Sequence, residues 1–151
     1  MRETKMSKSD ASYGQLISDE EDVRLDVQNQ VLRYFDADIY HRVISGYASP
    51  RILDVGCGTG DMIANMVTGI DAPTVFGIDN AKRQIDAACK RHPTHNFSVL
   101  DVESDTFLDD MRRWMASQDV CSFDVINCSM VLMHLADPTT ARSSSVNATT
   151  D

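Results

Sequence analysis

The residues best suited to bind a ligand are three glycines in a loop. Gly56, Gly58 and Gly60 come directly after the apolar run 51–55, and periodic apolar residues follow them. A glycine at the first position permits a tight turn, one at the second lets the backbone approach a ligand, and one at the third permits close packing into a helix. Such a loop between a strand and a helix is typical of sites that bind nucleotide-like cofactors. The alternative is a turn with a purely structural role.

The spacing of this loop differs from that of a dinucleotide-binding loop, which reads G-x-G-x-x-G. Here the third glycine comes one place early, and Asp61 follows it. An acidic residue at the start of a helix repels a pyrophosphate, which uses the exposed N–H groups and the positive end of the helix dipole. The loop therefore favours a cofactor without phosphate groups.

Strand-like and helix-like segments alternate around this loop. We expect strands at 51–55, 74–78, 97–100 and 123–128, and helices at 22–46, 62–70, 82–91 and 107–115. The expected inward positions of the helices include Val27, Val31, Phe35, Ile39, Val43, Ile85, Ala88, Cys89, Leu108 and Met111. Alternating strands and helices require crossover connections. The pattern predicts an α/β fold with an N-terminal helix and a Rossmann-like, doubly wound parallel sheet in the order 3-2-1-4, with ligands at the carboxyl ends of strands 1 and 4.

Charge and cysteine content exclude several classes of protein. The net charge is −9 and the basic residues are scattered, which disfavours a nucleic-acid partner. The four cysteines have neither the spacing of zinc ligands nor that of a C-x-x-C pair, so we expect reduced, mostly buried thiols and no metal. The N-terminus has no apolar stretch, so we expect no signal peptide, no membrane span and a cytoplasmic location.

The run RILDVGCGTGD resembles the first motif of class I S-adenosylmethionine-dependent methyltransferases. The later segment FDVINCSMVLMHLADP is similar to the stretch of that family in which a strand leads into a short apolar helix along the cofactor. The closest likeness is to small-molecule methyltransferases of the quinone-biosynthesis type. The resemblance implies S-adenosylmethionine as the cofactor and a small molecule as the substrate.

The resemblance also implies roles for individual residues. Asp79 would bind both ribose hydroxyls, which suits a carboxylate with two accepting oxygens. Asp101 would accept from the adenine amino group, and the Val102 N–H would donate to a ring nitrogen. Both aspartates could instead serve turns, and His134, a candidate base near the substrate entrance, could instead cap a helix. The expected cofactor-binding residues are Asp54, Gly56, Cys57, Gly58, Gly60, Asp79, Asn80, Asp101, Val102, Ser129 and Met130.

The likeness covers residues 22–138, and the polar stretches 1–21 and 139–151 are expected to be disordered tails. We expect a domain truncated after its fourth strand, whose exposed edge would pair with a second copy to form a homodimer. Three functions stay open: a small-molecule methyltransferase, a cofactor-binding module without activity, and a nicotinamide-dependent oxidoreductase. Tyr34, Tyr40 and His41 are candidates for substrate recognition, although packing or solvent exposure would explain them equally.

Overall fold

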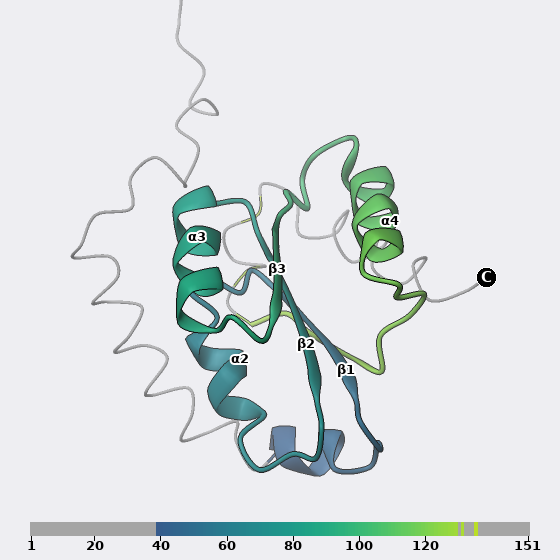
Figure 1. Ribbon diagram of the computed structural model, residues 1–151. Coiled ribbons are helices and arrows are strands. Elements are labelled where there is room, and N and C mark those ends of the chain that lie inside the picture. Colours follow the sequence, from purple (N-terminus) through teal and green to yellow (C-terminus); the bar gives the residue numbers. More distant parts are fainter. Residues whose placement is uncertain (1–38, 130, 132–134, 136–151) are drawn as a thin grey trace, which may run out of the picture.

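The computed structural model describes residues 39–129, 131 and 135, and its centre is a parallel sheet of four strands (Figure 1). The strands lie in the order β3-β2-β1-β4. This order and the parallel pairing confirm the predicted α/β, Rossmann-like arrangement. The elements are β1 (Arg51–Val55), α2 (Asp61–Met66), β2 (Thr74–Asp79), α3 (Lys82–Arg91), β3 (Asn96–Val99), α4 (Phe107–Ser117) and β4 (Val125–Asn127).

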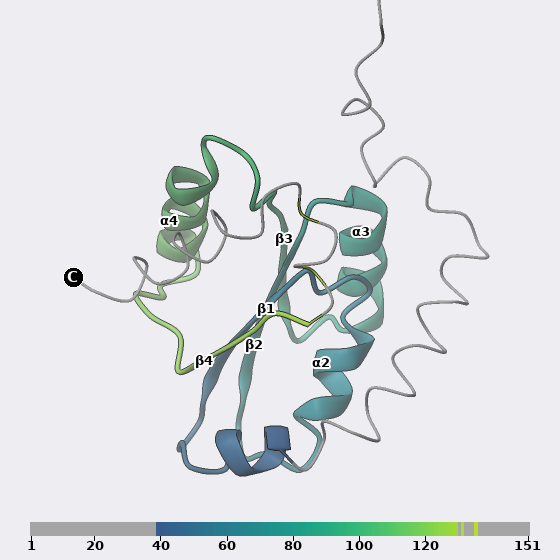
Figure 2. The same cartoon turned by 180° about the vertical axis from the view of Figure 1, so that it is seen from behind.

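Helices cover both faces of the sheet, with α2 and α3 on one side and α4 on the other (Figures 1 and 2). Successive strand residues point to opposite faces, so neighbours in β1 join different clusters. Ile52 packs with the α2 side chains, whereas Leu53 packs with Met111 of α4. This alternation places Asp54, two residues after Ile52, on the α2 face of the sheet.

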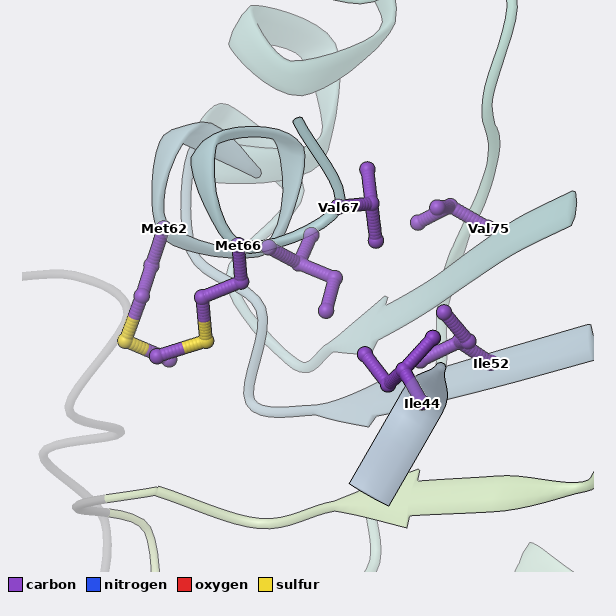
Figure 3. Close-up of a cluster of buried hydrophobic side chains, with 7 residues drawn as sticks. Ile44, Ile52, Met62, Met66, Val67 and Val75 are labelled. Carbon is purple, nitrogen blue, oxygen red and sulfur yellow. The ribbon is translucent and has the colours of Figure 1, made fainter. Parts of the chain in front are cut away.

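The cluster on the α2 face joins four parts of the chain. Met62 and Met66 of α2 belong to it with Ile52 of β1, and Figure 3 shows Val67, just after α2, directed toward Val75 of β2. Ile44 comes from a short helical segment at residues 39–44 and is fully buried in the same cluster. Tyr40, one turn earlier, is half-buried and packs against it. The helical segment is thus fixed against the face on which Asp54 lies.

The cluster on the α4 face is built around an aromatic side chain of β2. Phe76 makes edge-to-face contacts with Trp114 of α4 and with Phe123, at ring-centroid distances of 6.0 and 5.3 Å. Such contacts stabilise a packing by about 0.5–1.5 kcal/mol beyond the area they bury. The beginnings of β1 and β4 are tied together as well, because the Arg51 backbone N–H donates to the Asp124 carboxylate at 2.8 Å.

Several inward positions predicted from the sequence are wrong. Ile39 and Val43 are 56% and 50% exposed, because the segment at 39–44 turns Tyr40 and Ile44 toward the core instead. Cys89 is exposed, and Gln84 takes the third buried position of α3 beside Ile85 and Ala88. Leu108 of α4 is also exposed, at 36%. The predicted positions Val27, Val31 and Phe35 lie outside the described residues.

The prediction of mostly buried thiols is also wrong. Cys57 is buried, whereas Cys89, Cys121 and Cys128 are exposed, and all four are free. Within the part of the chain that the structure describes, no helix is long and apolar enough to cross a membrane.

Candidate cofactor site

The glycine-rich loop leaves the carboxyl end of β1 beside the carboxyl end of β2. Val55 pairs with Ile78 in the parallel register, so the two strands end side by side. The N–H groups of Gly56 and Cys57 both donate to the Ile78 carbonyl, at 2.7 and 3.0 Å. Gly56, Gly58 and Gly60 have φ of 71°, 54° and 75°, a region that residues with a Cβ rarely adopt. The loop therefore folds back over the end of β2.

Asp79 ends β2 and binds this loop directly. Its Oδ2 accepts from the Gly58 N–H at 3.0 Å, and its Oδ1 accepts from the Ala81 N–H at 2.9 Å. Burial raises the pKa of Asp79, although the N–H groups of Ala81, Gly58 and Asn80 oppose the rise. Each carboxylate oxygen has a second lone pair, so the half-buried side chain can still accept from a ligand.

The three loop glycines have different surroundings. A Cβ added to Gly58 would meet no described residue within 4 Å, so within this part of the chain the loop borders open space. A Cβ on Gly60 would lie 2.7 Å from the Phe97 ring, and one on Gly56 would lie 2.0 Å from Val131 Cγ2. Gly60 and Gly56 are thus required by close packing, whereas Gly58 leaves room beside Asp79.

Cys57 fills the inside of the loop. It is 6% exposed, and its Sγ lies 2.8 Å from the place where a Cβ on Gly77 would be. Burial raises the pKa of the Cys57 thiol, and the charges of Asp54 and Asp79 raise it further. A thiol that is hard to ionise is a poor nucleophile, which agrees with the interpretation of Cys57 as a small residue that fits the loop.

Asp54 lies beneath the loop and is fully buried. Its Oδ1 accepts from Asn127 Nδ2 of β4 at 2.6 Å, while Oδ2 has no hydrogen-bond partner among the residues that the structure describes. Burial raises the pKa of Asp54 from 3.8 to about 7, the charge of Asp79 adds to the rise, and the Asn127 amide opposes it. A buried carboxylate oxygen without a hydrogen-bond partner lowers the stability of the fold. A group that donates a hydrogen bond to Oδ2 would therefore stabilise this site.

Asp61, at the start of α2, is held by three neighbours. Its carboxylate accepts from the Thr59 hydroxyl at 2.8 Å, contacts His92 Nε2 at 2.7 Å and pairs with Arg91. Burial opposes its ionised form, but the hydrogen bonds from Thr59 and His92 and the charge of Arg91 outweigh this and hold the pKa of Asp61 below its usual value. The Arg91 guanidinium balances the negative charge of Asp61. Asp61 therefore repels a pyrophosphate less than we expected from the sequence.

The other predicted residues lie around the same end of the sheet or outside the described residues. Asp101 follows β3, is exposed, and accepts from the Glu103 N–H through Oδ1 at 2.9 Å, a local turn contact. Val102 packs against the α4-side cluster, and Asn80 is exposed beside Asp79. Ser129 follows β4 and is half-buried. Met130 and His134 lie outside the described residues.

Comparison with known proteins identifies the family. A profile described as "Methyltransferase domain" matches residues 48–144, which include the loop, Asp79 and all four strands. The chain belongs to this family. Its first motif and its sheet order place it among the class I S-adenosylmethionine-dependent methyltransferases.

Curated relatives of this methyltransferase domain share one name. The ubiquinone biosynthesis O-methyltransferase of Actinobacillus pleuropneumoniae serotype 5b is 31% identical over 104 residues, which are 67% of this chain and 42% of the relative. The enzyme of the same name from Neisseria meningitidis serogroup C is 34% identical over 99 residues, 63% of this chain and 39% of the relative. The chain thus spans about two fifths of the length of these relatives.

Solved structures share the fold of the methyltransferase domain. The plantazolicin methyltransferase BpumL, in complex with a pentazolic desmethylPZN analogue and SAH, superposes with a TM-score of 0.63 at 18% identity, covering 91% of this chain and 51% of that one. The [4+2]-cyclase SpnF superposes with a TM-score of 0.56 at 23% identity, covering 74% and 39%. A cyclase among these neighbours illustrates that the fold alone does not define the reaction.

Reasoning from the sequence did not predict the surroundings of Asn127 and Tyr40. Asn127 was assigned only to a strand, yet its amide holds Asp54. Tyr40 was considered for substrate recognition, but its hydroxyl is buried and has no partner among the described residues. Its spacing of four from Ile44 was the available signal, because residues one turn apart share a helix face. Within the described part of the chain, no group of three or more His, Cys, Asp or Glu side chains could hold a metal ion.

Proposed function

We propose that this chain binds S-adenosylmethionine at the carboxyl ends of β1 and β2, and that it is the cofactor-binding part of a methyltransferase for a small-molecule acceptor. The observation that carries the proposal is the bond between Gly58 N–H and Asp79 Oδ2, at 3.0 Å. This bond holds the Asp79 carboxylate, which can accept from ribose hydroxyls, beside Gly58, the loop glycine that borders open space.

The residues present fit the chemistry of this cofactor. Asp79 has two oxygens that can each accept from one hydroxyl of a ribose diol. Asp54 has a buried oxygen without a partner in the described chain, which suits a cationic donor such as the amino group of a methionine. When bound, the cofactor supplies an electrophilic methyl group on a sulfonium, so the protein's task is chiefly to hold the reactants in position. The adenine roles of Asp101 and Val102 stay part of this proposal.

Replacing Gly58 by alanine tests whether the open space beside the loop is a binding site. We expect Gly58→Ala to keep its fold but to bind S-adenosylhomocysteine at least about tenfold more weakly, because the Cβ enters the space that the ligand needs. Positive φ at this position adds about 1–2 kcal/mol of strain. Calorimetric titration measures the affinity, and urea unfolding measures the loss of unfolding free energy that the strain causes.

Gly69→Ala is the matched control for this variant. Gly69 also has a positive φ, of 85°, but follows α2, and its added Cβ would make only an ordinary contact, 3.9 Å from His41. The control should therefore lose similar stability and keep its affinity. Equal affinities for Gly58→Ala and the unaltered chain would contradict the proposed position of the site.

The acceptor is proposed to carry an oxygen nucleophile. The support is the printed name of the curated relatives, which are ubiquinone biosynthesis O-methyltransferases. The test is transfer of a labelled methyl group from S-adenosylmethionine to a catechol, with an amine and a thiol as rival acceptors. Label on the catechol alone supports the proposal, and label on the amine or the thiol alone contradicts it.

A cofactor-binding module without activity is the second candidate. This chain matches only 42% and 39% of two curated relatives, so methyl transfer is measured separately from cofactor binding. A chain that binds S-adenosylhomocysteine but methylates none of the three acceptors would support this alternative. The predicted homodimer and the predicted cytoplasmic location stay predictions within this proposal.

A further inference from the structure

The carboxylate of Asp61 joins the glycine-rich loop to the end of a helix that lies 30 residues further along the chain. Thr59, inside the loop, donates to Oδ2 at 2.8 Å. Arg91, the last residue of α3, pairs with the same oxygen, and Nε2 of His92, directly after α3, lies 2.7 Å from Oδ1. We call these four residues the Asp61 cluster. The loop and α3 are therefore connected through one side chain.

The bonds in the Asp61 cluster are directed toward an ionised carboxylate. Burial opposes the ionisation of Asp61, but the hydrogen bonds from Thr59 and His92 and the charge of Arg91 hold its pKa below the usual value. An ionised carboxylate only accepts hydrogen bonds, so His92 Nε2 carries the hydrogen and donates. The side chains of Asp61 and His92 are 25% and 21% exposed, so water competes less for this bond than for a surface ion pair. The bond therefore restrains both residues more than a surface contact would.

Aromatic rings pack against the loop beside the Asp61 cluster. A Cβ added to Gly60 would lie 2.7 Å from Phe97 Cζ and 3.3 Å from His92 Cδ2. The ring centroids of His92 and Phe97 are 6.5 Å apart, and the ring of His95 lies 5.9 Å from the first and 6.2 Å from the second. The corner between α3 and β3 thus contacts the backbone of Gly60, and its polar groups hold the residue that follows.

The two parts of the loop are held by different elements. The N–H groups at positions 56–57 donate to the Ile78 carbonyl of β2, and the Asp61 cluster holds Thr59. Gly58, which borders open space, lies between these two attachments. Glycines have many accessible backbone conformations, and ordering them on binding costs free energy. A loop that is already held in its binding conformation avoids part of this cost.

We propose that the Asp61 cluster positions the glycine-rich loop for the cofactor, with Asp61 and His92 as positioning residues that act through Thr59 and do not contact the ligand. The inference rests on the proposed function and adds to it His92, a residue outside the loop. Arg91 contributes less than His92, because its side chain is 43% exposed and its charge is screened by solvent.

The test compares variants of His92 by calorimetric titration of the full chain with S-adenosylhomocysteine. His92→Phe removes the donor and keeps an aromatic ring against Phe97, and we expect it to bind at least about fivefold more weakly. His92→Gln keeps an N–H donor and should restore most of the affinity. His95→Phe is the matched control, because it makes the same exchange in the ring stacked on His92 and leaves the three bonds to Asp61 in place. It should bind normally.

Two further measurements show whether His92 acts through Asp61 and the loop. Both Asp61→Ala and His92→Phe break the same connection, so the double variant should bind no more weakly than Asp61→Ala alone. In the ligand-free chain, the Gly60 N–H donates to the Cys57 carbonyl at 2.9 Å. Amide hydrogen exchange at this N–H should be faster in His92→Phe than in the unaltered chain, and unchanged in His95→Phe.

The outcomes separate this inference from the proposed function. Equal losses of affinity in His92→Phe and His92→Gln would assign the effect to ring packing and overturn the inference. Normal affinity in His92→Phe, or unchanged exchange of the Gly60 N–H in that variant, would overturn it as well. Additive losses in the double variant would show that Asp61 and His92 act independently, and would also contradict it. If the unaltered, folded chain does not bind S-adenosylhomocysteine, the proposed function fails and the inference fails with it.

Discussion

An Asp79→Ala chain is expected to bind S-adenosylhomocysteine at least about 100-fold more weakly than the unaltered chain. The substitution removes two acceptors for the ribose hydroxyls, and hydrogen bonds to a charged group contribute about 1.5–3 kcal/mol each. It also leaves the N–H groups of Gly58 and Ala81 without their acceptor, which loosens the loop. Calorimetric titration measures the affinity.

The Asp79 variant needs a control for general effects of removing a carboxylate. Asp86→Ala supplies it, because Asp86 is an exposed residue of α3 that pairs with Lys82. Asp79→Asn keeps one accepting oxygen and should have an intermediate affinity. Full affinity in Asp79→Ala would show that the ligand binds elsewhere, and would contradict the site assigned here.

The second large effect is on the pH dependence of stability, and it comes from Asp54. Burial raises the pKa of Asp54 from 3.8, its ordinary value in an unfolded chain, to about 7 in the folded chain. Between these values the folded state holds a proton that the unfolded state releases, so stability is lost as the pH rises from about 4 through about 7. The loss amounts to about 4 kcal/mol at most, at about 1.4 kcal/mol for each pKa unit.

Asp54→Asn removes this pH dependence and keeps an oxygen for the Asn127 amide. We expect the unfolding free energy of the variant, relative to that of the unaltered chain, to rise by about 3 kcal/mol between about pH 5 and about pH 8, because about two pH units of the titration lie in this range. Urea unfolding at both pH values measures it, with Asp86→Asn as the control. A difference that does not change with pH would contradict the raised pKa of Asp54.

These effects illustrate a cost that binding residues impose on a fold. A buried carboxylate oxygen that lacks a partner among the described residues lowers stability, and the proposed cationic ligand would supply the missing donor. We expect Asp54→Asn to stabilise the chain near pH 8 and to weaken its affinity for a ligand with an amino group. The two results together would distinguish a binding role of Asp54 from a structural one.

The sheet and its loop could be predicted because their signals are local. Short apolar runs alternate with amphipathic helices, and Gly56 to Gly60 stand at the junction of β1 and α2. The fixed hand of crossovers restricts the possible sheet orders, and the Rossmann pattern supplies the order 3-2-1-4. The position of Asp79 at the end of a strand was also predicted, because the apolar run stops directly before it. In each case the deciding residues lie within a few positions of one another.

The parts that were missed depend on contacts distant in the sequence. Asn127 reaches Asp54 across 73 positions, and Arg91 reaches Asp61 across 30, so neither partner could be identified from spacing. The rotation of the helical segment at 39–44 was also misjudged, because its apolar residues are compatible with more than one inward face. Packing against the sheet selects the face of Tyr40.

The most direct test of the central claim is calorimetric titration of the unaltered chain with S-adenosylhomocysteine, repeated with NAD as a competing ligand. Our account predicts micromolar binding at one site, no displacement by NAD, and loss of binding in Asp79→Ala. Displacement of S-adenosylhomocysteine by NAD would point to a dinucleotide site. No heat of binding from a chain that circular dichroism shows to be folded would contradict the claim that this chain holds the cofactor.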